Sequence, residues 1–140
     1  MSQLVVQVMQ LNGLLLAAGD ALAAPVGQSS ARWQVMAAVE SKPASVAAIA
    51  RLLNLARQSV QRVADLLVEE GLASYEENPF HARAKNLRLT ASGGRALRQI
   101  QGAQRQWANE LAARLDAEQV AAANGLLQQL RQLLQNDDTA

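Results

Sequence analysis

Apolar residues recur at helical spacing through most of this chain, and they alternate as in a β-strand only between residues 72 and 89. A strand-like pattern confined to one short stretch excludes a sheet-based fold. It predicts helices packed on helices with a single hairpin. The chain has 140 residues, half of them hydrophobic, which is enough for one domain with a buried core.

The composition excludes several kinds of chemistry. Cysteine is absent and there is one histidine, so disulfides, thiol chemistry and Cys- or multi-His metal sites are ruled out. No Ser/His/Asp set, paired-carboxylate cleft or phosphate-binding glycine loop stands out, and Gly93-Gly94 is too short for the last. We expect no enzyme activity, no cofactor and no metal.

The first 19 residues carry no charged side chain, as in a membrane segment. Four amides interrupt this apolar run: Gln3, Gln7, Gln10 and Asn12. Burying such amides in lipid is costly, and the first basic side chain is Arg32, so the basic start of a secretory signal is missing. We expect a soluble, buried helix over 3–23, a cytoplasmic location and no membrane partner.

The charge is unevenly distributed although the net charge is only +1. Three arginines and no acid lie from Arg51 to Arg62, and six basic residues and no acid lie between Glu77 and Glu110. A basic middle with apolar ends suits a polyanion-binding centre flanked by association surfaces. From charge alone, an ordinary solvated surface is the alternative.

The first half of the chain predicts four helices. Ala24-Pro25 ends the helix over 3–23, and Ser29 or Ser30 caps a second helix over about 30–41. Ser45 caps a short helix over 45–53, and the next helix runs over about 57–70, with Gly71 at its C′ position. The last two helices, joined by a tight connection, predict a helix-turn-helix.

The second half predicts a hairpin and two more helices. Strands over 72–76 and 85–89 are joined by a loop, and a hairpin directly after a helix-turn-helix is a wing. Thr90 caps a long helix over about 91–114, and Asp116 starts a last helix over about 117–135. The predicted fold is mainly α with a small β-hairpin wing, a winged helix-turn-helix.

This order of elements resembles the MarR family of bacterial transcriptional regulators. The residues that carry the resemblance are Ala31-Arg32-Trp33-Gln34-Val35-Met36, Val46–Leu53, Arg57-Gln58-Ser59-Val60, Glu70-Gly71-Leu72, Asn78-Pro79, Arg83-Ala84-Lys85 and Leu87-Arg88-Leu89-Thr90. The resemblance is clear over about residues 30–98 and extends to the ends by architecture.

The resemblance implies a homodimeric, cytoplasmic repressor that binds double-stranded DNA at a pseudo-palindromic operator. We expect a single domain over 1–140 with a DNA-binding lobe at 30–90, a connecting helix at 91–114 and dimerisation helices at 3–23 and 115–136. The apolar candidates for dimerisation on the two terminal helices are Leu4, Val8, Leu11, Val120, Leu127, Leu130 and Leu134.

The candidate DNA contacts lie on the helix over 57–70 and on the wing. Arg57 and Arg62 are candidates for guanine or phosphate, Gln58 and Gln61 for adenine, and Ser59 for phosphate. On the wing, Arg83 is the candidate tip contact. Lys85 and Arg88 are either phosphate anchors or partners in salt bridges of the wing stem.

Many proteins of this kind bind small lipophilic or phenolic effectors, and ligand binding lowers the DNA-competent population. The candidate pocket residues are Leu15, Trp33, Met36 and Trp107, although apolar residues at helical spacing more often form plain core.

One departure from the family pattern supports an alternative function. The wing tip reads Phe80-His81-Ala82-Arg83, without the acidic residue that the family usually carries there and with Ala82 at a basic position. The alternative is a winged-helix interaction module with lost or weak DNA binding.

Overall fold

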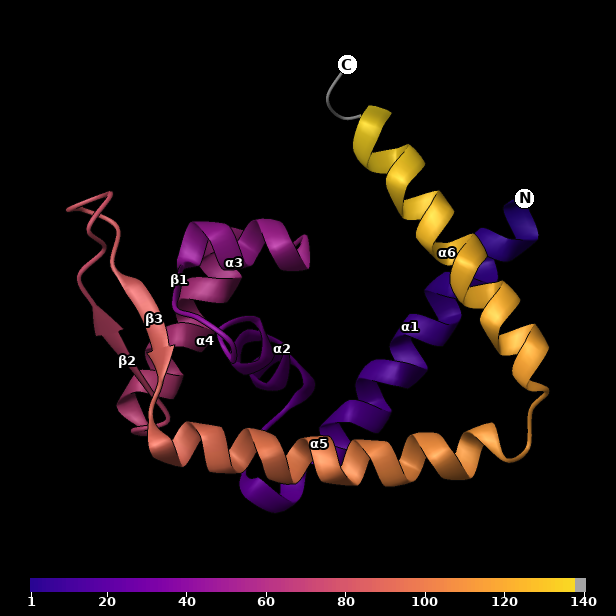
Figure 1. Ribbon diagram of the computed structural model, residues 1–140, viewed down its shortest axis with the longest axis horizontal. Coiled ribbons are helices and arrows are strands. Elements are labelled where there is room, and N and C mark those ends of the chain that lie inside the picture. The colour runs from indigo at the N-terminus through magenta and orange to yellow at the C-terminus, as the bar shows by residue number, and fades with distance from the viewer. Residues whose placement is uncertain (138–140) are drawn as a thin grey trace. The chain divides into compact units, whose positions relative to one another are not determined.

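The computed structural model describes residues 1–137 (Figure 1). Its elements are α1 (Ser2–Ala23), the 3-10 turn η1 (Ala24–Val26), α2 (Ser30–Ala38), β1 (Ala44–Ser45), α3 (Val46–Leu53), α4 (Arg57–Glu69), β2 (Ala73–Glu76), β3 (Asn86–Leu89), α5 (Ala91–Ala112) and α6 (Ala117–Asp137). The chain divides into two compact units, Met1–Gln104 and a second that begins at Arg105, so α5 contributes to both.

The mainly helical fold with a small antiparallel sheet confirms the predicted fold class. The sheet has three strands in the order β1-β3-β2, with Tyr75 and Ala44 both opposite Leu87 on the central strand. The sequence predicted only the β2–β3 hairpin. Strand β1 escaped notice because two residues are too few to show an alternating pattern.

Hydroxyl side chains begin three of the helices, as the sequence predicted. The backbone N–H of Arg32 donates to Ser29 Oγ at 3.3 Å, that of Ala48 to Ser45 Oγ at 3.2 Å, and that of Gly93 to Thr90 Oγ1 at 3.1 Å. These bonds satisfy N–H groups that have no partner within the first turn of a helix. The starts of α2, α3 and α5 are therefore set by local chemistry.

The helix ends agree less closely with the sequence prediction. Helix α2 ends at Ala38 rather than near 41. The N–H groups of Val39 and Glu40 donate to the carbonyls of Met36 and Ala37, three residues back instead of the four of an α-helix. Helix α5 ends two residues earlier than expected and α6 two residues later. The end of α4 is as predicted, since Gly71 follows its cap with φ of 75°.

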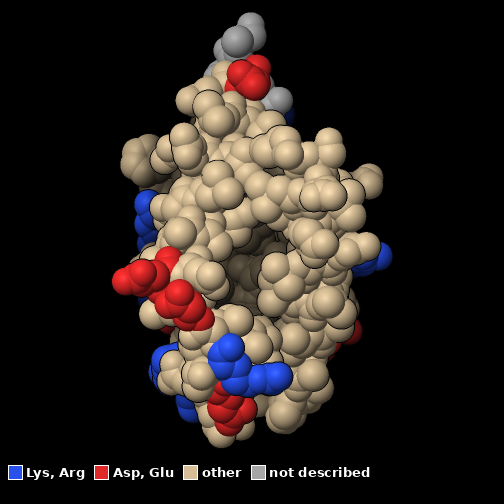
Figure 2. Space-filling model, turned by 90° about the vertical axis from the view of Figure 1, so that its right-hand side faces the viewer, with Lys and Arg blue, Asp and Glu red and all other residues tan. Residues whose placement is uncertain are grey.

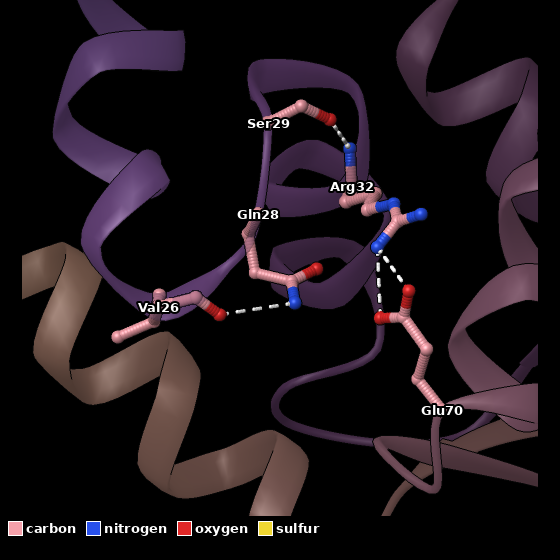
Figure 3. Close-up of polar contacts among 5 residues, drawn as sticks. All are labelled: Val26, Gln28, Ser29, Arg32 and Glu70. Atoms are coloured by element: carbon pink, nitrogen blue, oxygen red, sulfur yellow. Dashed lines mark hydrogen bonds and ion pairs between the residues drawn. The ribbon is translucent and has the colours of Figure 1, made fainter.

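The core of the first unit lies between α2, α3, α4, the sheet and the first half of α5. Its largest completely buried side chains are Met36, Ile49, Leu67, Leu87, Leu97, Ile100, Val35 and Val60. At the edge of this core, Arg32 of α2 donates to both carboxylate oxygens of Glu70 at 2.6 and 2.8 Å (Figure 3). Both bonds come from the same guanidinium nitrogen, Nη1, and this charged contact joins the start of α2 to the end of α4.

Helix α1 joins α2 through a close polar contact. The Ser30 N–H donates to Asp20 Oδ1 at 2.7 Å, and its hydroxyl donates to the Leu16 carbonyl at 2.6 Å. A side chain at Gly19 would collide with the Ser30 hydroxyl. Nearby, the amide of Gln28 donates to the carbonyl of Val26, the last residue of the turn η1 (Figure 3).

Most of α1 is exposed, contrary to the expected burial on several sides. Of its residues, Gly19 and Ala23 are buried, whereas Leu14 is 70% and Met9 72% exposed. The segment Ser2–Val26 is long and apolar enough to cross a membrane by length and composition. The prediction that α1 is buried is wrong for a single chain, because the other described elements of that chain cover only a small part of this helix.

The second unit consists of the last part of α5, from Arg105, and of helix α6. Helix α6 contains no buried residue over Ala117–Asp137, although leucines and a valine recur along it. Asp116 accepts the N–H of Glu118 at 3.1 Å and so begins the helix as predicted.

The two glycines near the start of α5 give a test of its packing against Leu72, the residue before β2. A methyl group at Gly93 would collide with the carbonyl oxygen of Leu72, which is backbone and cannot move aside, whereas one at Gly94 would meet the flexible end of Arg98. We expect Gly93→Ala to lower the free energy of unfolding by about 2 kcal/mol. Gly94→Ala should change it by less than about 1 kcal/mol, on the stabilising side.

Urea denaturation of the two variants and the parent measures these changes. Equal midpoints for Gly93→Ala and Gly94→Ala would contradict the described approach of α5 to Leu72.

Candidate nucleic-acid interface

Helix α4 has one buried and one exposed side. Val60, Ala64 and Leu67 are at most 1% exposed and pack into the core. The residues predicted for DNA contact are all exposed on the remaining surface of this helix: Arg57, Gln58, Ser59, Gln61 and Arg62. Because the helical period places the two sets on different sides, the burial of one presents the other to solvent.

A hollow of about 550 Å³ lies between α3, α4 and the wing. It is lined by Ser45, Val46, Ala47, Arg57, Gln58, Gln61, Tyr75, Arg83, Ala84 and Lys85. The structure thus brings together five of the eight residues predicted for DNA contact. Ser59, Arg62 and Arg88 do not line this hollow.

Four basic side chains on α4 and the wing are unpaired within the described part of the chain. Among residues 1–137, Arg57, Arg62, Arg83 and Lys85 form no ion pair and no side-chain hydrogen bond. Arg88 differs, because its Nη1 lies 3.4 Å from Glu76 Oε2 across the hairpin. The four free cations are available to an external anion, whereas Arg88 already has a carboxylate neighbour.

A hydrogen-bonded ring joins α4 to the wing strand β2. The Tyr75 hydroxyl donates to Asp65 Oδ1 at 2.6 Å, and Gln61 Nε2 donates to that oxygen and to the Tyr75 oxygen, at 2.9 Å each. The sequence predicted a role for Gln61 but none for Asp65 and Tyr75. The i, i+4 spacing of Gln61 and Asp65 could have suggested their bond, but nothing local indicates that Tyr75 reaches them.

Burial raises the pKa of Tyr75 to about 12, and its hydrogen bond to Asp65 and the Asp65 charge act in the same direction, while the bond from Gln61 opposes them. The phenol is therefore neutral at physiological pH and remains a hydrogen-bond donor to the carboxylate.

The wing loop is shaped by an asparagine. Asn78 Oδ1 accepts the N–H of Phe80 at 3.0 Å, and Asn78 Nδ2 donates to Asn86 Oδ1 at 3.3 Å. The loop beyond it carries exposed His81 and Arg83, and Phe80 is 87% exposed.

The four residues predicted for an effector pocket do not share one setting. Leu15 and Trp33 line a smaller hollow of about 280 Å³ between α1 and α2, together with Asn12, Leu16, Gly19, Ser30, Gln34 and Ala37. Met36 is completely buried in the core and does not line this hollow. Trp107 belongs to the second unit.

Comparison with known proteins gives consistent matches. A model of the MarR family matches residues 27–84. The uncharacterised protein Rv2011c of Mycobacterium tuberculosis is 42% identical over 99 residues, which cover 71% of this chain and 69% of that protein, and a Mycobacterium bovis protein matches equally.

Solved structures match over nearly the whole chain. A MarR family transcription regulator superposes with a TM-score of 0.83 at 17% identity, covering 96% of this chain and 93% of that one. MarR of Staphylococcus aureus in complex with salicylate and kanamycin gives 0.84 at 13% identity, with 96% and 92% covered. A mutant MarR of E. coli complexed with operator DNA gives 0.75 at 20% identity, with 90% and 94% covered.

The single tyrosine of the chain makes the ring between α4 and β2 measurable. Its pKa of about 12 lies above the unfolded value of about 10, so the stabilisation is complete below pH 10 and is lost as the pH rises towards 12. We expect phenolate absorbance of the folded protein to rise well above pH 10. Asp65→Asn should shift the rise towards 10, because the carboxylate charge is removed.

The urea-unfolded chain serves as the reference for this titration. A phenolate midpoint near 10 in both folded proteins would show that Tyr75 is free in solution.

Proposed function

Because the chain belongs to the MarR family of transcription regulators, we propose that it binds double-stranded DNA sequence-specifically as a homodimer. Members of this family are regulators and not enzymes, in agreement with the expected absence of catalytic chemistry. The observation that carries the proposal is a single hollow lined by three cations, Arg57, Arg83 and Lys85, whose side chains are unpaired within residues 1–137.

We propose that α4 enters the major groove and that the wing follows the adjacent backbone. A groove about 12 Å wide admits an α-helix, and arginine and glutamine can reach base edges there. Arg57, Arg62 and Arg83 then contact guanine or phosphate, with Lys85 as a phosphate anchor. Arg88, beside Glu76, contributes mainly to the wing stem.

A second copy of the chain is the proposed cover for α1 and α6. Large apolar side chains are exposed along both helices, among them Leu11 at 50%, Leu14 at 70% and Leu134 at 66%. Figure 2 shows a face of the molecule on which uncharged residues prevail. Apolar surface on this scale is rarely left open to water in a soluble protein, so we assign segments 3–23 and 115–136 to dimerisation.

Two-fold pairing presents two copies of α4, which suits two half-sites about one helical turn apart, roughly 34 Å. The lobe over 30–90 then binds DNA, and the helix over 91–114 connects it to the dimerisation segments. We propose that occupancy of the operator represses transcription.

The hollow beside Leu15 and Trp33 is the proposed place for a small lipophilic or phenolic effector. The S. aureus structure named above, a complex with salicylate and kanamycin, supports effector binding by a protein of the same fold. An effector that favours a DNA-incompetent arrangement shifts the population away from the operator. The alternative is an interaction module without DNA binding, which the acid-free wing tip at 80–83 favours.

Truncation of a free arginine tests DNA binding by α4. Arg62→Ala should weaken binding to duplex from the chain's own upstream region and reduce the slope of log K against log salt by about 0.9 for each phosphate that is no longer neutralised. Arg98→Ala, which removes an exposed arginine from α5, should leave both unchanged. Fluorescence anisotropy across a salt series measures both quantities.

Equal affinity for random and upstream duplex, together with a flat salt response, would favour the interaction module instead.

A paired substitution tests the dimer. Leu127→Lys places a charge on the apolar side of α6 and should lower the sedimentation mass from about 30 kDa, twice the chain's 15.0 kDa, towards one chain. Gln128→Lys adds the same charge at the adjacent exposed position and should leave the dimer intact.

Sedimentation equilibrium at several concentrations gives the masses. If Leu127→Lys sediments like the parent, this side of α6 does not form the interface.

A further inference from the structure

Gln61 lines the hollow between α3, α4 and the wing, and the nitrogen end of its amide is hydrogen-bonded to two other side chains. Its Nε2 donates to Asp65 Oδ1 and to the Tyr75 hydroxyl oxygen, while the Tyr75 hydroxyl donates to the same Oδ1. Asp65 lies on α4 and Tyr75 on β2, so the ring spans the helix and the wing. Each of the three side chains is held by the other two.

The chemistry of Asp65 determines which end of the amide faces it. An ionised carboxylate only accepts hydrogen bonds, so it requires the NH₂ end of Gln61. The oxygen Oε1 is then at the other end and accepts no hydrogen bond from residues 1–137. A free glutamine can turn its amide round, but here that rotation would set two acceptors against each other and break both donated bonds.

We propose that Asp65 and Tyr75 hold Gln61 as an acceptor that selects adenine or cytosine at one position of each half-site. This inference rests on the proposed DNA-binding function. Adenine and cytosine present exocyclic amino donors in the major groove, whereas guanine and thymine present acceptors at the equivalent places. An acceptor facing an acceptor is unfavourable, so guanine and thymine are rejected.

Gln61 thus contacts the base, and Asp65 and Tyr75 are positioning residues. The sequence alone indicated adenine for Gln61, and the fixed amide extends this choice to cytosine. The side chain of Gln58, on the same helix, makes no hydrogen bond with residues 1–137, so its amide can adopt either orientation. Substitution of Gln58 is therefore the matched comparison for substitution of Gln61.

The experiment selects bound duplexes from a library with randomised half-sites, using the 140-residue chain at one salt concentration. The parent should enrich adenine or cytosine over guanine and thymine about fivefold or more at one position of each half-site. Gln61→Ala should abolish this preference and leave the others. Gln58→Ala should retain it.

Two variants test the positioning residues without removing Gln61. Tyr75→Phe should weaken the preference at that position in the selection, while the salt slope of binding, measured separately by fluorescence anisotropy across a salt series, stays unchanged. Asp65→Asn can pair with either end of the amide, so guanine and thymine should become accepted there. Thermal melting of each variant confirms that it is folded.

The inference would be overturned if the preference survived in Gln61→Ala. It would also be overturned if Tyr75→Phe weakened the retention of all duplexes equally. A parent that retains duplexes without an adenine-or-cytosine position overturns it while leaving DNA binding intact. A parent that retains no duplex at all overturns the proposed function as well.

Discussion

The burial of one side of α4 is the constraint on which the rest of the structure depends. Val60, Ala64 and Leu67 are closed into the core, and a rigid helix that buries these positions has to present the intervening ones to water. Arg57 and Arg62 are thereby held on the surface by packing, with no polar contact of their own within residues 1–137. The Arg32–Glu70 contact then attaches the end of α4 to α2, and the Gln61–Asp65–Tyr75 ring attaches its middle to the wing.

Signals that act within a few residues were readable from the sequence. Ser29, Ser45 and Thr90 begin helices because a short hydroxyl side chain satisfies a free N–H group, and Gly71 follows α4 because its φ is positive. The apolar spacing on α4 identified its buried side in the same way. These local rules, together with the change of period after Gly71, were enough for the winged-helix fold.

What the sequence did not reveal depends on tertiary contacts. The two residues of β1 become a strand because β3 lies beside them, and Tyr75 meets Asp65 because the wing folds back against α4. The sequence spacing of Met36 fits a pocket residue and a core residue equally well. The packing of α2 in the structure places Met36 in the core. The exposure of α1 is a further case, since apolar spacing indicates that a surface will be covered but not by which chain.

The two units of the chain thus have different physical characters. The first encloses a core and presents free cations from α4 and the wing, whereas α6 in the second unit buries none of its residues over Ala117–Asp137. In the proposed dimer, stability and a DNA-reading geometry arise in the same step, because the pairing that would cover the apolar helices also duplicates α4.

The central claim is that α4 reads the major groove twice. Guanine N7 faces that groove, so methylation interference on an operator fragment tests the claim directly. Methylated guanines should block binding in two clusters about one helical turn apart, roughly 34 Å. Binding that is indifferent to N7 methylation, or blocked within a single cluster, would contradict it.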